Sequence, residues 1–178
     1  MLQKLPAIMF SKADVEKYFV AEKSESLLFI IIGLAAIVMA VVFFFWLKTP
    51  FYKGAAIPLL VIAILQITVG YTVYSRSDKQ RIDIAYKMDL NPSAIQQNEL
   101  PRMEKVMKNF VLFRWVEIAL LVIGLICFFI YRNETAKAFY CGLGMALAVE
   151  SAVMLAADYS AESRGRVYLE GMKSMFRK

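Results

Sequence analysis

The sequence predicts an all-α integral membrane protein, a bundle of four transmembrane helices with amphipathic cytoplasmic helices. Two observations lead to this prediction. Of the 178 residues, 60% are hydrophobic, more than the roughly half that is usual in a soluble domain. The excess is concentrated in four blocks, and each block has the roughly 20 residues that a helix needs to cross about 30 Å of hydrocarbon.

The four predicted spans are 27–47, 54–75, 109–131 and 138–157. The first two contain no charged residue, so they lack the polar face that a helix of a soluble bundle requires. The third contains Arg114 and Glu117, and the fourth contains Glu150. These spans therefore favour a bilayer over the alternative, a soluble bundle of four buried helices.

The distribution of basic residues predicts the orientation. Sixteen of the 21 lysines and arginines lie in 1–26, 76–108 and 158–178, and only four lie in the two short connections. The positive-inside rule places the three long segments, and with them both termini, in the cytoplasm, as expected for a bacterial inner-membrane protein. The net charge of +6 is then explained by anionic lipid head groups at this surface, and no nucleic-acid partner is expected.

The three cytoplasmic segments are predicted to be helical. An amphipathic helix is expected within 1–26, over residues 2–22, with Ser11 and Asp14 forming an N-cap, and it would lie on the inner leaflet or against the cytoplasmic loop. The 76–108 segment should continue the second span until Asn91-Pro92 stops and restarts the helix. The 158–178 segment is expected to be an amphipathic tail.

Small residues predict where helices approach one another closely, because they let two backbones come near. The fourth span is the richest in them, so it is expected at the centre of the bundle. The candidate packing residues are Gly33, Ala36 and Ala40 in the first span and Gly142, Gly144, Ala148 and Ala152 in the fourth.

Polar side chains at one depth form the candidate site. Gln66, Glu117 and Glu150 each lie about 12 Å inside their spans, with Arg114 slightly nearer the cytoplasm. One interpretation is structural: Arg114 pairs with Glu117 or Glu150, and Gln66 hydrogen-bonds across helices. The other is a proton or cation site whose affinity Arg114 tunes. Its cytoplasmic entrance would be lined by Thr68, Tyr71, Thr72, Tyr74 and Asp158.

Several classes of chemistry lack their usual residues. The chain has no histidine and two cysteines, so no metal or cofactor is expected, and His-based nucleophilic catalysis is disfavoured. No phosphate-binding or nucleophile-elbow motif occurs. Cys127 and Cys141 lie near the outer ends of adjacent spans; a disulfide is possible in principle, but two free cysteines in apolar packing are favoured.

Two functional hypotheses follow. The first is a non-enzymatic accessory, assembly or protective (immunity-like) partner of another membrane protein, acting through its spans and cytoplasmic helices, with a homo-oligomer as another form of partnership. The second is a small proton- or ion-coupled transporter or channel that uses Glu150, Glu117 and Arg114. An enzyme acting on lipid is the weakest hypothesis, because the carboxylates have no obvious nucleophile or metal ligand beside them.

Overall fold

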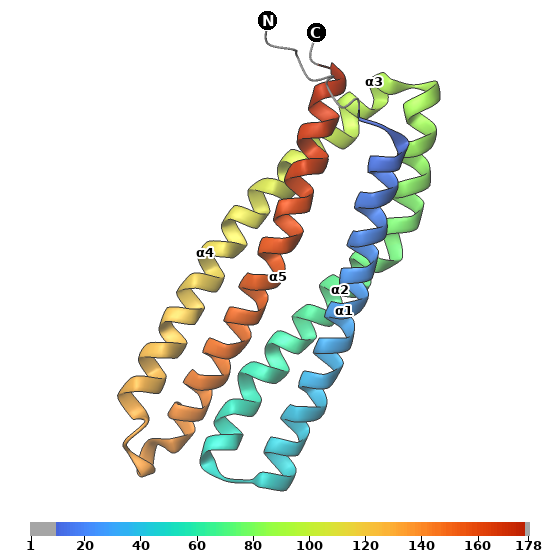
Figure 1. Cartoon of the computed structure of the whole chain (residues 1–178). Helices are drawn as coiled ribbons and strands as arrows, with labels where there is room; N and C mark the ends of the chain where they lie inside the picture. The colour runs from blue at the N-terminus through green and yellow to red at the C-terminus, as the bar shows by residue number, and fades with distance from the viewer. Residues whose placement is uncertain (1–9, 177–178) are drawn as a thin grey trace, which may run out of the picture.

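The protein is entirely helical in the part that the structure describes. The computed structural model describes residues 10–176, and no strand occurs among them. The elements are α1 (Lys12–Val41), the π-helical turn η1 (Val42–Leu47), α2 (Pro50–Leu90), α3 (Pro92–Ala94), the π-helical turn η2 (Ile95–Glu99), α4 (Leu100–Tyr131), the 3-10 turn η3 (Thr135–Lys137) and α5 (Ala138–Phe176) (Figure 1).

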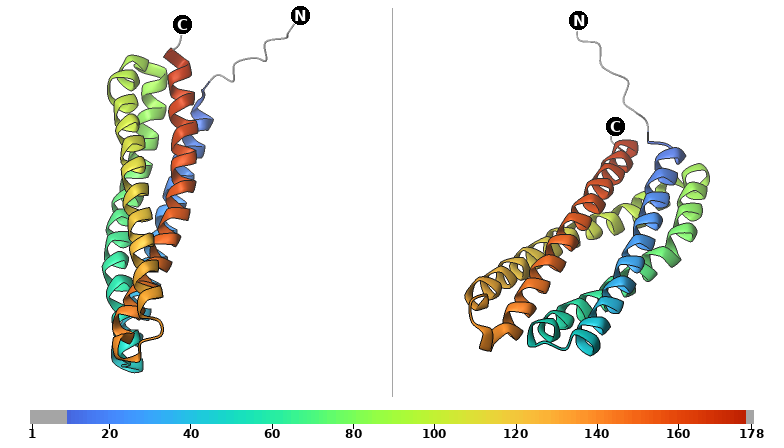
Figure 2. Two further views of the ribbon diagram at one scale, coloured as in Figure 1. Left: turned by 90° about the vertical axis from the view of Figure 1, so that its left-hand side faces the viewer. Right: turned by 60° about the horizontal axis from the view of Figure 1, so that its bottom comes forward.

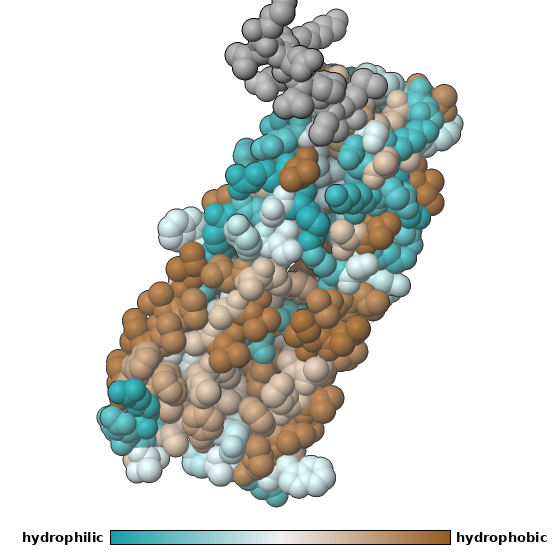
Figure 3. Space-filling view, in the orientation of Figure 1, coloured by the Kyte–Doolittle hydropathy of each residue, from teal (hydrophilic) through white to brown (hydrophobic). Residues whose placement is uncertain are grey.

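Four helices are long and apolar enough to cross a membrane, consistent with an integral membrane protein. They are also much longer than a span requires: α2 has 41 residues, which is about 60 Å. On the face that Figure 3 shows, apolar side chains predominate over one half of the molecule and polar ones over the other. We call the half with the α1–α2 and α4–α5 turns the apolar half, and the half with α3 and the chain ends the polar half.

The N-terminal helix is continuous with the first apolar segment. The Ser11 backbone N–H and hydroxyl both donate to the Asp14 carboxylate at 2.8 Å, and these side-chain and backbone hydrogen bonds lower the pKa of Asp14. From Lys12 the helix runs to Val41 without a break. The separate surface helix expected over 2–22 is therefore the first part of α1, and residues 2–9 lie outside the described part of the chain.

The turn between the hairpins is built at Asn91. The Asn91 side chain accepts hydrogen bonds from the Ala94 backbone N–H at 3.3 Å and from the Ser93 hydroxyl at 2.6 Å, so it caps the helical turn that Pro92 begins. The opposite turn, between η1 and α2, requires a left-handed backbone at Lys48, with φ of 55°. The Thr49 hydroxyl then accepts from the Tyr52 backbone N–H and caps α2.

The helices form two antiparallel hairpins, α1–α2 and α4–α5, which lie side by side (Figures 1 and 2). The hairpins meet mainly where α2 packs on α5, and these two helices run parallel. In the polar half, side chains from all four long helices bury an aromatic core that includes Phe19, Ile84, Met103 and Tyr168. In the apolar half the buried cluster consists mostly of alanines of α1 and α2.

Glycines allow the helices of the apolar half to touch backbone to backbone. A Cβ atom on Gly142 would lie 1.9 Å from the Phe51 carbonyl oxygen of α2, and one on Gly124 would lie 2.8 Å from the Gly144 carbonyl oxygen. Of the candidate packing residues, Gly33, Ala36, Ala40, Gly142, Gly144 and Ala148 are buried. The packing role expected of Ala152 is wrong, because this residue is exposed and lines a groove between α4 and α5.

We expect Gly142→Ala to lower the free energy of unfolding by about 1–3 kcal/mol, because overpacking a tight contact forces the backbones apart. The measurement is thermal or denaturant unfolding of the purified protein in detergent. Gly165→Ala is the matched control on the same helix: its Cβ would meet the flexible Met107 side chain, with the sulfur at 3.1 Å. Equal losses in the two variants would contradict the backbone contact of α2 with α5.

Candidate functional site

Arg114 is paired with Glu162 and with neither of the carboxylates predicted for it. The Arg114 guanidinium donates to Glu162, whose other oxygen accepts from Arg166 at 2.7 Å. Burial of Glu162 raises its pKa, but the hydrogen bonds from the two arginines outweigh burial and hold the pKa below its usual value. The predicted salt bridge of Arg114 with Glu117 or Glu150 is therefore wrong, because α5 continues beyond residue 157 and carries Glu162 to Arg114.

Without Arg114, Glu117 faces a second acid. Glu117 is 7% exposed, and its Oε2 is buried and has no hydrogen-bond partner among the described residues. The Asp158 carboxyl of α5 lies beside it. No ion pair within residues 10–176 includes Glu117, Asp158 or Glu150. Because like charges repel strongly where water is excluded, a proton or a cation beside two adjacent buried carboxyls would be favourable.

The Glu117–Asp158 pair borders two hollows. The first is a groove of about 450 Å³ between α4 and α5, which both carboxyls line together with Arg114 and Glu162. The second, of about 150 Å³, lies among all four long helices where the apolar and polar halves join. Asp158 and Phe110 line both hollows. Asp158 therefore connects the inter-helix cavity to Glu117.

Charged side chains from three helices line the inter-helix cavity beside apolar ones. Arg164 pairs with Glu25, and Arg76 lies 3.9 Å from Glu22. The Nε atoms of both arginines are buried without a hydrogen-bond partner among the described residues. Buried polar groups of this kind are commonly satisfied by internal water, so this cavity suits water or a small ion.

Gln66 and Glu150 lie in a different interface. The Gln66 side chain is 2% exposed and donates to the Met154 sulfur of α5 at 3.2 Å, while its Oε1 has no partner in the described part of the chain. Glu150, 7% exposed, precedes Met154 by one turn on the face that meets α2. The single polar layer expected from the sequence is thus divided: Gln66 and Glu150 lie between α2 and α5, and Glu117 and Arg114 lie between α4 and α5.

Most of the predicted entrance lies elsewhere. Thr68, Tyr71 and Thr72 are exposed on the outer surface of α2, and the two threonine hydroxyls donate to carbonyls of their own helix, at 2.7 and 2.8 Å. Tyr74 lies beneath the Lys23 ammonium, 4.8 Å from the ring centroid. Of the five expected residues, Asp158 alone lines either of the two hollows described above.

The residues that do line the cavity, Glu22, Glu25, Arg76 and Arg164, were not predicted. They were missed because the sequence predicts a separate helix within 1–26, on the inner leaflet or against the cytoplasmic loop, and this helix is not expected to line a cavity of the bundle. The available signal was the spacing of Glu22 and Glu25, which puts two acids on adjoining faces of a helix immediately before an apolar block.

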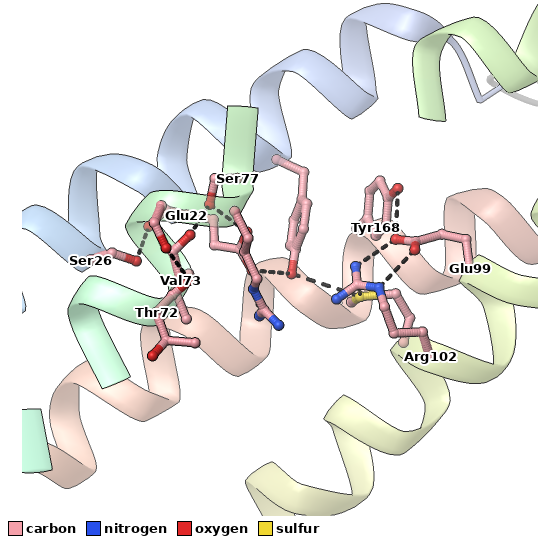
Figure 4. A network of polar contacts seen from close by, with 12 residues as sticks. Glu22, Ser26, Thr72, Val73, Ser77, Glu99, Arg102 and Tyr168 are labelled. Atoms are coloured by element: carbon pink, nitrogen blue, oxygen red, sulfur yellow. Dashed lines mark hydrogen bonds and ion pairs between the residues drawn. The ribbon is translucent and has the colours of Figure 1, made fainter. Parts of the chain in front are cut away.

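A network of polar contacts closes the polar half beyond the cavity (Figure 4). Glu22 accepts from the Ser77 hydroxyl at 3.0 Å and from Tyr18 at 3.3 Å. Arg102 donates to both oxygens of Glu99, at 2.7 and 2.6 Å. These contacts link α1 with α2 and brace the start of α4.

Two tyrosines complete this network. The rings of Tyr18 and Tyr168 stack with centroids 4.2 Å apart, and the Tyr168 hydroxyl donates to Glu99 at 3.3 Å. Burial raises the pKa of both phenols above the usual value, so they remain neutral hydrogen-bond donors. The network therefore fastens α1, α4 and α5 together on the far side of the cavity.

Neither cysteine is bonded to the other. Cys141 is buried and Cys127 partly buried, and both are free. The Cys127 thiol donates to the Tyr140 carbonyl oxygen at 3.4 Å. Among residues 10–176, no group of three or more histidine, cysteine or acidic side chains is arranged to hold a metal ion.

Comparison with models of known protein families, with curated proteins and with solved structures gives no match for this chain.

We expect Glu99→Gln to lower the free energy of unfolding by about 2–4 kcal/mol, because it leaves the partly buried Arg102 guanidinium without its counter-charge. Replacing both residues, Glu99→Gln with Arg102→Met, should recover most of this loss. Unfolding in detergent measures both changes. Glu104→Gln breaks the more exposed pair with Lys173 and should change stability little; a comparable loss there would show that burial of Glu99 is not the cause.

Proposed function

We propose that this chain is a small proton- or cation-coupled transporter of the bacterial inner membrane, with its polar half in the cytoplasm. Four helices of sufficient length and hydropathy support insertion. The excess of basic residues in 1–26, 76–108 and 158–178 supports the orientation through the positive-inside rule. Basic side chains of the polar half would then contact anionic lipid head groups.

The orientation can be tested with single cysteines in a variant that lacks Cys127 and Cys141. We expect Ser93→Cys, in the exposed turn after α2, to react with a membrane-impermeant maleimide only after the cells are permeabilised. Asn133→Cys, exposed in the α4–α5 turn, is the matched control and should react in intact cells. The reverse pattern would overturn the orientation, and with it the direction from which the cavity is reached.

The Glu117–Asp158 pair is the observation that carries the transport proposal. A carboxylate within the apolar half costs at least ~2.5–3.5 kcal/mol on insertion scales, so it is retained where it binds something. Glu117 has an unsatisfied buried oxygen and no ion-pair partner in the described chain, whereas Arg114, which could have neutralised it, is held by Glu162. The pair is therefore suited to take up a proton or a cation.

Access to the pair differs between the two sides of the bundle. Towards the polar half, Asp158 borders the charged cavity formed by all four helices. Towards the other side, Gly124 and Gly144 bring α4 and α5 into backbone contact, and Gly142 does the same for α5 and α2. This arrangement supports a state in which the Glu117–Asp158 pair is reached from the cytoplasm and closed to the outside, as alternating access requires.

Proton flux into liposomes tests the proposal. With the purified protein reconstituted, a potassium diffusion potential should drive proton movement, read by a pH-sensitive dye enclosed in the vesicles. We expect Glu117→Gln to reduce this flux to that of protein-free vesicles, because glutamine cannot bind a proton, and Asp158→Asn to slow it at least tenfold.

Two matched carboxylates serve as controls. Glu134→Gln, in the exposed α4–α5 turn, and Glu150→Gln, in the α2–α5 interface, should leave the flux within about twofold of the parent. If Glu150→Gln abolishes flux while Glu117→Gln preserves it, the coupling group lies between α2 and α5 and the assignment to Glu117 is wrong.

The other hypothesis, an accessory or protective partner of a second membrane protein, stays a prediction. It expects no flux from the purified chain, together with a stoichiometric companion after affinity purification in mild detergent. The structural interpretation of the polar layer depended on a salt bridge of Arg114 with Glu117 or Glu150. Arg114 instead pairs with Glu162. We therefore favour transport.

A further inference from the structure

The groove between α4 and α5 has the composition of a binding site for an amphiphile. Its volume is about 450 Å³, within the range of small-molecule sites. Its charged residues are Arg114, Glu117, Asp158 and Glu162; its remaining residues are apolar or aromatic. Tyr159, 75% exposed, and the exposed Ala152 and Ala156 place the opening on the outer surface of the bundle, where lipid would lie.

The charges of the groove favour a cation. Three carboxyls and one guanidinium line the groove, and that guanidinium, of Arg114, is held by Glu162. Glu117 and Asp158 have no cationic partner among the described residues, and the buried Glu117 Oε2 is unpartnered. Tyr159 adds an aromatic ring at the rim, a group that attracts organic cations through its face.

The apolar walls extend from the carboxyls into the apolar half. Ile118 and Leu121 continue the wall within about 6 Å of Glu117 along α4, and Leu155 faces them from α5. An inorganic ion would use the carboxyls and leave this wall uncovered. An anionic lipid head group would meet two carboxyls that no described arginine or lysine neutralises.

We propose that this groove binds a lipophilic organic cation, an amine or quaternary onium ion with an alkyl or aryl body. The positive charge sits in the groove beside Glu117 and Asp158, and the apolar body lies along Ile118, Leu121 and Leu155. This inference rests on the proposed function, since it names the class of substrate for the same carboxyl pair. The ligand enters sideways from the bilayer, because the groove opens on the lipid-facing surface.

Equilibrium dialysis of the purified full-length protein in detergent with radiolabelled tetraphenylphosphonium tests the proposal. We expect saturable binding by the parent protein. Glu117→Gln should weaken binding at least tenfold by removing the charge. Leu121→Trp should weaken it at least tenfold by filling the groove.

Ile126→Trp is the matched control: it lies on the same helix, is 53% exposed and does not line the groove, so it should bind like the parent. Absence of saturable binding, or binding that neither Glu117→Gln nor Leu121→Trp weakens, overturns the groove as the site. If the parent shows Glu117-dependent proton flux but no binding, this inference fails and the proposed function stands. Binding that depends on both residues, without proton flux, supports the groove and overturns proton-coupled transport.

Discussion

The close contact of α5 with both α2 and α4 is the constraint on which the rest of the structure depends. Lipid supplies no hydrophobic force between helices, so association relies on packing and on polar contacts. Gly142 admits the α2 backbone on one face of α5, and Gly144 admits α4 on the other. Once these faces are fixed, the helical repeat determines every position further along: Glu150 and Met154 face α2, while Asp158 and Glu162 face α4.

The helical architecture is predictable from the sequence because the length and hydropathy of the apolar blocks are sufficient for it. The four long helices and the caps at Ser11 and Asn91 follow from local signals that need no knowledge of neighbours. The partner of Arg114 was missed because Glu162 lies beyond the predicted end of the fourth span. The helix continues unbroken past that boundary, so the acidic residues of its next turn can also reach Arg114. The entrance residues of α2 were misplaced because the segment is nearly uncharged. Without a polar face, the sequence does not indicate which side of the helix is buried.

The buried acids of the two halves differ in their partners. In the polar half, Glu22, Glu99 and Arg102 each have partners from neighbouring residues or helices, so the network holds the helix ends in one arrangement. In the apolar half, Glu117 and Gln66 each retain an oxygen without a partner in the described chain. Paired acids at one end and an unpaired one at the other are what a rigid base supporting a ligand-accepting region requires.

The aromatic core of the polar half has a consequence for the response to lipid composition. Phe19, Met103 and Met172 are buried by other side chains of the same protein, so their environment does not depend on acyl-chain length. In a bilayer, hydrophobic mismatch would act on the apolar half. A thinner or thicker bilayer would therefore change the tilt of the apolar half of the two hairpins while the polar half keeps its arrangement. The resulting strain would be greatest at the junction of the two halves, where Asp158 lies.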